Sequence, residues 1–106
     1  MKQPLSLSRR GDFGRVLHDG TRIRAVAGTM MVASRADADS PGRLGLAVPA
    51  RVGGAVGRNR IKRRLRAAFR AAGPTGVDVL VRAEATAQTA PFQELEEMFR
   101  RLSLSR

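Results

Sequence analysis

The residues best suited to chemistry in this chain are cations and one amide that crowd into residues 53–70, GGAVGRNRIKRRLRAAFR. This segment holds seven Arg or Lys side chains and no acid. Guanidinium groups are planar forks that match phosphate oxygens, and an amide can both donate to and accept from a base edge or a sugar hydroxyl. On a helix, the spacing i, i+4, i+7, i+11 would align Asn59, Arg63, Arg66 and Arg70, with Arg60 beside them. The chemistry predicted is binding of a nucleic-acid backbone.

The alternative is that these charges form only the solvated outer face of a helix. Such a face usually mixes signs, because Glu with Lys or Arg at i, i+4 stabilises a helix by about 0.2 to 0.5 kcal/mol and like charges cost a similar amount. Here the neighbouring pairs repel: Arg60 with Arg64, Arg63 with Arg66, and Arg66 with Arg70. Stability alone would not select these residues, so an external polyanion is the better explanation.

No catalytic constellation accompanies the cations. The sequence has no GxSxG, HExxH or phosphate-loop pattern, and Gly53, Gly54 and Gly57 do not fit the dinucleotide fingerprint. Asp37 and Asp39 fall in a polar loop, where two carboxylates are usually solvated. His18, the only histidine, lies near a predicted helix end, where it would more often complement the helix dipole than act as a base. We therefore expect no catalytic residue and no metal site in this chain.

Composition limits the class of protein further. The chain has 106 residues, a formal net charge of +11 and no cysteine, which predicts one domain, residues 1–106, attracted to a polyanion. Residues 1–8 are expected to be an extended lead-in. The sequence has no run of about 18 apolar residues and no apolar signal segment, so we expect a cytoplasmic protein without a membrane partner.

The predicted elements form an α+β domain that would present the basic helix. The spacing of apolar residues and the positions of turn-forming residues predict a helix over 9–18, strands over 21–33 with a break at Gly28, and a loop over 34–42. They further predict a strand over 43–49, the basic helix over 55–72 and a strand over 77–82. A last helix would carry Phe92, Leu95, Met98, Phe99 and Leu102. The basic helix would bury Ile61, Leu65, Ala68, Phe69 and Ala72. Phe13 in the first helix is either a core residue or a stacking platform for a nucleobase.

The motif at the start of the basic helix resembles that of the bacterial ribonuclease P protein subunit. The matching positions are Gly53, Ala55, Val56, Arg58, Asn59, Arg60, Ile61, Lys62, Arg63, Arg66 and Phe69. Asp12-Phe13, Gly45 to Pro49 and Asp78 to Arg82 extend the likeness over the chain. The sequence departs from the family in having Leu17 and Met31 where aromatic residues are frequent, and Ala50 in place of a lysine.

This resemblance implies the protein component of a ribonucleoprotein endoribonuclease that removes the 5′ leader of precursor tRNA. The predicted elements give a four-stranded mixed sheet in the order α-β-β-β-α-β-α, and the resemblance implies a left-handed βαβ crossover where the general rule gives a right-handed one. The partners would be the catalytic RNA and precursor tRNA, with no protein partner required; the active site and its magnesium would belong to the RNA. The implied RNA-binding residues are Arg51, Arg58, Asn59, Arg60, Lys62, Arg63, Arg66 and Arg70. Phe13 would bind the leader. The alternative is a ribosomal-type RNA-scaffolding protein without a role in tRNA cleavage.

Overall fold

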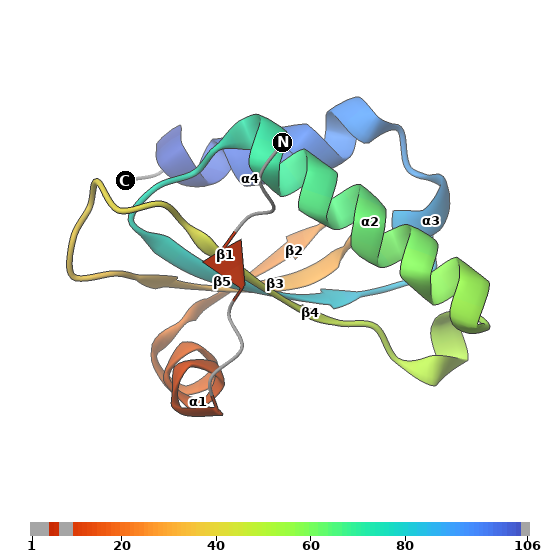
Figure 1. The fold of residues 1–106 in the computed structure, drawn as a ribbon, viewed down its shortest axis with the longest axis horizontal. Helices are drawn as coiled ribbons and strands as arrows, with labels where there is room; N and C mark the ends of the chain where they lie inside the picture. Colours follow the sequence, from red (N-terminus) through yellow and green to blue (C-terminus); the bar gives the residue numbers. More distant parts are fainter. Residues whose placement is uncertain (1–4, 7–9, 105–106) are drawn as a thin grey trace.

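A five-stranded sheet with helices on both faces forms the protein (Figure 1). The computed structural model describes residues 5–6 and 10–104, with side chains from residue 14 to residue 102. The elements are β1 (Leu5–Ser6), α1 (Arg10–Asp19), β2 (Thr21–Ala25), β3 (Gly28–Ser34), β4 (Arg43–Ala47), the 3-10 helix η1 (Ala50–Val52), α2 (Ala55–Ala72), β5 (Val77–Ala83), α3 (Thr86–Thr89) and α4 (Phe92–Leu104). No described helix is long and apolar enough to cross a membrane.

The sheet is mixed and has the order β1-β4-β5-β3-β2. β1 and β5 both pair with β4 in parallel, whereas β3 pairs antiparallel with both β5 and β2. The four predicted strands and the predicted α+β class are confirmed. The sheet differs from the prediction by one added edge strand, the two-residue β1, which lies in the segment expected to be an extended lead-in.

The two faces of the sheet carry different helices. Figure 1 shows α2 and α4 on one face and α1 alone on the other. β4 and β5 run in the same direction, and the chain passes through α2 from β4, nearer the viewer, to β5 behind it (Figure 1). With α2 above the two strands, this path is a left-handed crossover, as the family resemblance implied.

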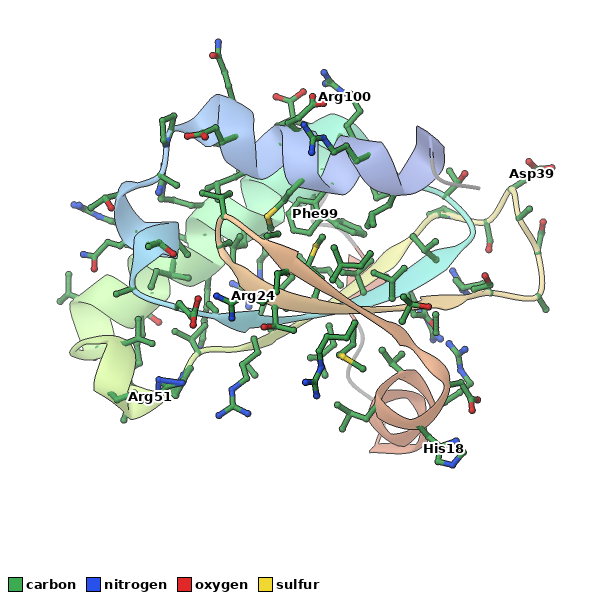
Figure 2. All side chains as sticks on the ribbon, turned by 180° about the vertical axis from the view of Figure 1, so that it is seen from behind. His18, Arg24, Asp39, Arg51, Phe99 and Arg100 are labelled. Carbon is green, nitrogen blue, oxygen red and sulfur yellow. The ribbon has the colours of Figure 1, made fainter. Side chains whose placement is uncertain are left out.

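The main core lies between the sheet and the α2–α4 layer. Along β5 the buried Val77, Val79 and Val81 face this layer, because side chains alternate between the two faces of a strand. Figure 2 shows Phe99 directed from α4 toward the sheet. Its ring meets that of Phe69 edge to face, with centroids 5.1 Å apart and planes at 85°, an arrangement that aromatic quadrupoles favour.

The predicted apolar stripes are confirmed except at one position. Ile61, Leu65, Ala68 and Phe69 of α2 are buried, and Ala72 packs against the same core. In α4 the residues Leu95, Met98, Phe99 and Leu102 are buried. Phe92 is the exception, because it begins α4 at the rim of the core and remains 38% exposed.

Two short elements were not predicted from the sequence. η1 precedes α2, and α3 precedes α4. α3 is held by a distant residue: Arg64 of α2 donates hydrogen bonds to the backbone oxygens of Ala87, at 2.6 Å, and Ala90. A contact of this kind joins elements far apart in the chain, so local sequence patterns do not reveal it.

Candidate nucleic-acid interface

The outward face of α2 is a row of exposed polar and cationic side chains. We name this set the α2 ridge and define it as Asn59, Arg60, Arg63 and Arg66, all exposed. Val56 lies one turn before Arg60 on the same face and is 79% exposed. Among the described residues, no ion pair reaches Arg60, Arg63 or Arg66. Of the predicted line of cations, Arg60, Arg63 and Arg66 are therefore exposed and without an acidic partner in this part of the chain, whereas Arg70 is half-buried.

The acids of α4 do not neutralise the α2 ridge. Glu96 pairs with Arg100, and Glu97 pairs with Arg101 at 3.5 Å, each one helical turn further along α4. Figure 2 shows Arg100 on the outer side of α4, away from the sheet. These i, i+4 pairs support their own helix, so the cations of the α2 ridge keep their mutual repulsion.

The other predicted RNA-binding residues of α2 have different surroundings. Arg58, Lys62 and Arg70 are half-buried rather than exposed. The Nε atom of Arg58 is buried and has no hydrogen-bond partner among the described residues. A buried guanidinium N–H without an acceptor is costly, and an acceptor supplied by a ligand at this position would remove that cost.

The start of α2 adds backbone donors to the same surface. Gly54 caps the helix without a side-chain hydrogen bond, and the first turn contains no acid. The first amide N–H groups of a helix lack partners inside it and attract anions. Arg51, exposed in η1, lies just before this end (Figure 2), so the cationic surface extends beyond the helix itself.

A second candidate surface lies on the opposite face of the sheet, beside α1. It is a groove of about 570 Å³, which we name the α1 groove. Its lining residues are Leu17, Arg22, Thr29, Met31, Ala47, Leu80 and Arg82. A smaller hollow of about 320 Å³ shares Ala47 and Arg82 with the groove and continues to Pro49, next to η1.

Strand register explains why the α1 groove has an apolar floor with cationic flanks. Arg22 lies opposite Met31, and Met31 lies opposite Leu80 in the next strand. In the next row of the same face, Thr29 lies opposite Arg82, which is paired in register with Ala47. The small side chain of Ala47 lines this end of the groove.

Sequence reasoning found part of the α1 groove and missed its cations. Leu17 and Met31 were singled out as departures from the family, and both line the groove. Phe13, the predicted leader-binding residue, lies in α1, but its side chain is outside the described residues. Arg22 and Arg82 were missed; the alternation of β2 and β5 was the signal that placed them on one face.

A buried carboxylate lies under α1 beside the groove. Asp78 of β5 is fully buried and receives hydrogen bonds from Arg43 at 2.7 and 2.8 Å and from Arg15 of α1. Arg35 approaches it at 3.6 Å. Burial alone would raise the pKa of Asp78, but the hydrogen bonds and charges of Arg43, with the charges of Arg15 and Arg35, hold that pKa below its usual 3.8.

The remaining candidates for chemistry do not form a site. Figure 2 shows His18 at the outer end of α1, where the hydrogen bond that its Nδ1 donates to the Asp19 carboxylate, together with the charge of that carboxylate, raises the pKa of the imidazole above 6.5. Asp37 and Asp39 are exposed in their loop, and the Asp39 backbone N–H donates to the Asp37 carboxylate at 2.9 Å. Across the described ranges, no three His, Asp or Glu side chains gather as a metal-ligand set.

Comparison with known proteins gives a consistent set of relatives. The sequence profile of the family described as Ribonuclease P matches residues 1–105. The chain is 46% identical over 102 residues to the ribonuclease P protein component of Acidothermus cellulolyticus, covering 91% of this chain and 82% of that protein. It is 39% identical over 90 residues to the corresponding protein of Kocuria rhizophila, covering 78% and 80% of the two chains.

Solved structures match in fold over nearly the whole chain. The RNase P protein of Staphylococcus aureus superposes with a TM-score of 0.74 at 23% identity, covering 95% of this chain and 94% of that one. The RNase P protein of Thermotoga maritima superposes with a TM-score of 0.72 at 22% identity, covering 94% and 97%. The fold is therefore shared although most residues differ between this chain and these two proteins.

Proposed function

Because the chain belongs to the bacterial ribonuclease P protein family, we propose that it binds the catalytic RNA of ribonuclease P through the α2 ridge and the 5′ leader of precursor tRNA through the α1 groove. Membership makes it the protein component of a ribonucleoprotein nuclease with an RNA partner. The finer proposal is that it promotes endonucleolytic 5′ maturation of tRNA in the cytoplasm.

The observation that carries the proposal is the uncompensated charge of the α2 ridge. Like charges at helical spacing destabilise the free helix, and phosphate groups would relieve this repulsion while accepting bidentate hydrogen bonds. Arg51, the open N-terminus of α2 and the unpartnered Nε of Arg58 border the same surface. We assign to this contact the residues Arg51, Arg58, Asn59, Arg60, Lys62, Arg63, Arg66 and Arg70.

The α1 groove suits a single strand better than a duplex. Bases of a single strand can lie on apolar side chains while cations along the groove follow the backbone. Leu17, Met31 and Leu80 supply the apolar surface, and the exposed Arg22 and Arg82 supply the charge. Phe13, from α1, is proposed to add an aromatic face to the same strand.

The chemical step is assigned to the RNA partner rather than to this chain. Hydrolysis of a phosphodiester requires an activated water, and magnesium ions held by the RNA would supply that activation. The described acids support this division, because Asp78 is surrounded by three arginines and Glu96 and Glu97 pair with their own helix. The contribution of the protein is to bind and orient the substrate.

Reconstitution at low magnesium tests the proposal. The protein is mixed with a bacterial ribonuclease P RNA and a precursor tRNA, with no other protein, and cleavage of the leader is followed with and without the chain. We expect cleavage only when the chain is present, and tighter substrate binding with a leader of several nucleotides than with none. RNA binding without rescue, and without an effect of the leader, would instead indicate a scaffolding protein.

A further inference from the structure

Asp78 joins three elements through one carboxylate. Arg15 comes from α1, Arg43 from β4, and Arg35 from the loop that follows β3. Arg15 also donates a hydrogen bond to the backbone oxygen of Ser34 at 3.2 Å. Because the carboxylate is fully buried and Asp78 is paired in register with β3 on one side and β4 on the other, its position is fixed by the sheet, and the arginines are positioned relative to it.

The three arginines do not have equivalent roles. β4 is already hydrogen-bonded to β5 along its whole length, so Arg43 reinforces a connection that the backbone makes. α1 has no backbone pairing with the sheet. Its described attachments to the sheet are the Arg15 contacts and a small apolar cluster in which Val16 packs with Ala33 and Leu80.

Among the α1 side chains that the structure describes, Val16 is the one buried in this apolar cluster, and apolar packing is not directional. Gly14 lies in the described part of α1 with open space around it, so this position adds no contact. The charge-assisted bond between Arg15 and Asp78 is directional and fixes the rotation of the helix. Leu17, two residues after Arg15, lines the α1 groove and is 58% exposed.

We propose that Asp78 is a positioning residue for the RNA leader: through Arg15 it holds α1 against the sheet and so fixes the wall of the α1 groove that Leu17 provides. This inference rests on the proposed assignment of the groove to the leader. Asp78 is buried and touches no ligand in this scheme; it acts only through the helix. Without the bond, the wall would move and the groove would lose its fixed width.

Two variants break the bond from opposite sides. Asp78→Asn removes the carboxylate charge, and Arg15→Gln removes the guanidinium, whose side chain is 35% exposed and therefore tolerant of change. The readout is the ratio of holoenzyme affinities for precursor tRNA with a leader of several nucleotides and for the same tRNA without one. This ratio, which we name the leader ratio, should fall by about tenfold, as expected when a binding group loses its fixed position.

A second readout follows the helix directly. Hydrogen exchange of the free protein should become faster at the amides of α1 in both variants, while α2 and α4 keep wild-type protection. The double variant Arg15→Gln/Asp78→Asn should lower the leader ratio no further than either single variant, because both remove one interaction. Affinity for the catalytic RNA, which the α2 ridge governs, should remain at the wild-type value.

Arg35→Gln is the matched control, because it removes a charge beside the same carboxylate, and its other described side-chain bond is to the backbone oxygen of Pro41 rather than to α1. It should lower stability and leave the leader ratio and α1 exchange unchanged. The proposal is overturned if folded Arg15→Gln keeps the wild-type ratio and wild-type α1 exchange, or if Arg35→Gln lowers the ratio equally. If the wild-type holoenzyme binds precursor tRNA equally with and without a leader, the assigned function of the groove is wrong. The hydrogen-exchange measurement would still show whether the bond between Arg15 and Asp78 holds α1.

Discussion

Arginine has three separate roles in this chain, and its surroundings determine which one each residue has. Arg64 satisfies the backbone oxygens of Ala87 and Ala90 and thereby holds α3. Arg43 is bonded to the buried Asp78. Arg63 is exposed, and no ion pair reaches it within the described residues. Only an exposed arginine without an ion pair, such as Arg63, requires an external partner, so charge alone does not identify the RNA contacts.

Arg63→Ala and Arg66→Ala should weaken binding of the catalytic RNA and reduce its salt dependence. Each lost phosphate contact should lower the slope of log affinity against log salt by about 0.7 to 0.9. Titrations of RNA at several salt concentrations measure this slope. Arg64→Ala is the control from the same helix: it should lower the melting temperature and change the slope less. Equal slopes for the wild type and both ridge variants would show that the α2 ridge does not contact RNA.

Asp78 should make stability depend on acid pH. Its pKa is lower in the folded protein than the usual 3.8, so its ion pairs stabilise the fold above the unfolded value and this stabilisation is lost as pH falls through the folded value. Asp78→Asn should reduce the free energy of unfolding at neutral pH by about 3 kcal/mol, since it removes the buried charge that faces three partly buried arginines. Urea unfolding between pH 7 and pH 2 should therefore give a flatter profile for the variant than for the wild type.

At the scale of elements, the β2–β3 hairpin depends on one glycine. Gly28 has φ of 138°, and a Cβ there would lie 2.2 Å from the backbone oxygen of Arg82. Gly28→Ala should therefore reduce the free energy of unfolding by about 2 kcal/mol or more, through backbone strain and this clash. Chemical denaturation of the two proteins measures the difference.

Gly14→Ala is the same chemical change, but we expect it to raise the free energy of unfolding. Gly14 lies inside α1 with nothing within 4 Å of the added methyl group. Alanine favours a helix over glycine by about 1 kcal/mol, so this variant should be more stable. A destabilised Gly14→Ala together with a neutral Gly28→Ala would contradict the positions assigned to both glycines.

The same elements show how far the sequence predicts the fold. α2 was predicted at its observed bounds because its apolar period is regular and Gly73-Pro74 ends it. The bonds that hold α3 and the pairing of β1 join distant segments, which no local pattern encodes. The groove cations were missed for the same reason: Arg22 and Arg82 become neighbours of one surface only through the register of three strands. The left-handed crossover came from family likeness alone, because the general rule for βαβ units predicts the other hand.

At the scale of the molecule, the sheet separates two candidate RNA surfaces. α2 lies on one face and the α1 groove on the other (Figure 1). Arg51 and the hollow at Pro49 lie near the end of the sheet where the chain passes from β4 into α2. One RNA on each face would not compete for space, so under the proposed function we expect the protein to bind the catalytic RNA and the leader at the same time. The net charge of +11 attracts both.

This separation predicts that variants of the two surfaces act independently. Arg66→Ala should weaken binding of the catalytic RNA equally for all substrates, whereas Arg82→Ala should weaken only binding of precursor tRNA that carries a leader. In the double variant the two losses of binding free energy should add to within about 0.5 kcal/mol, because the sites share no contacts. Holoenzyme assembly and leader-dependent substrate affinity are measured separately for the four proteins. A double variant whose loss of binding free energy is much smaller than the sum would indicate that both residues contact the same RNA segment. That result would contradict the assignment of two separate RNA surfaces, because these surfaces lie on opposite faces of the sheet.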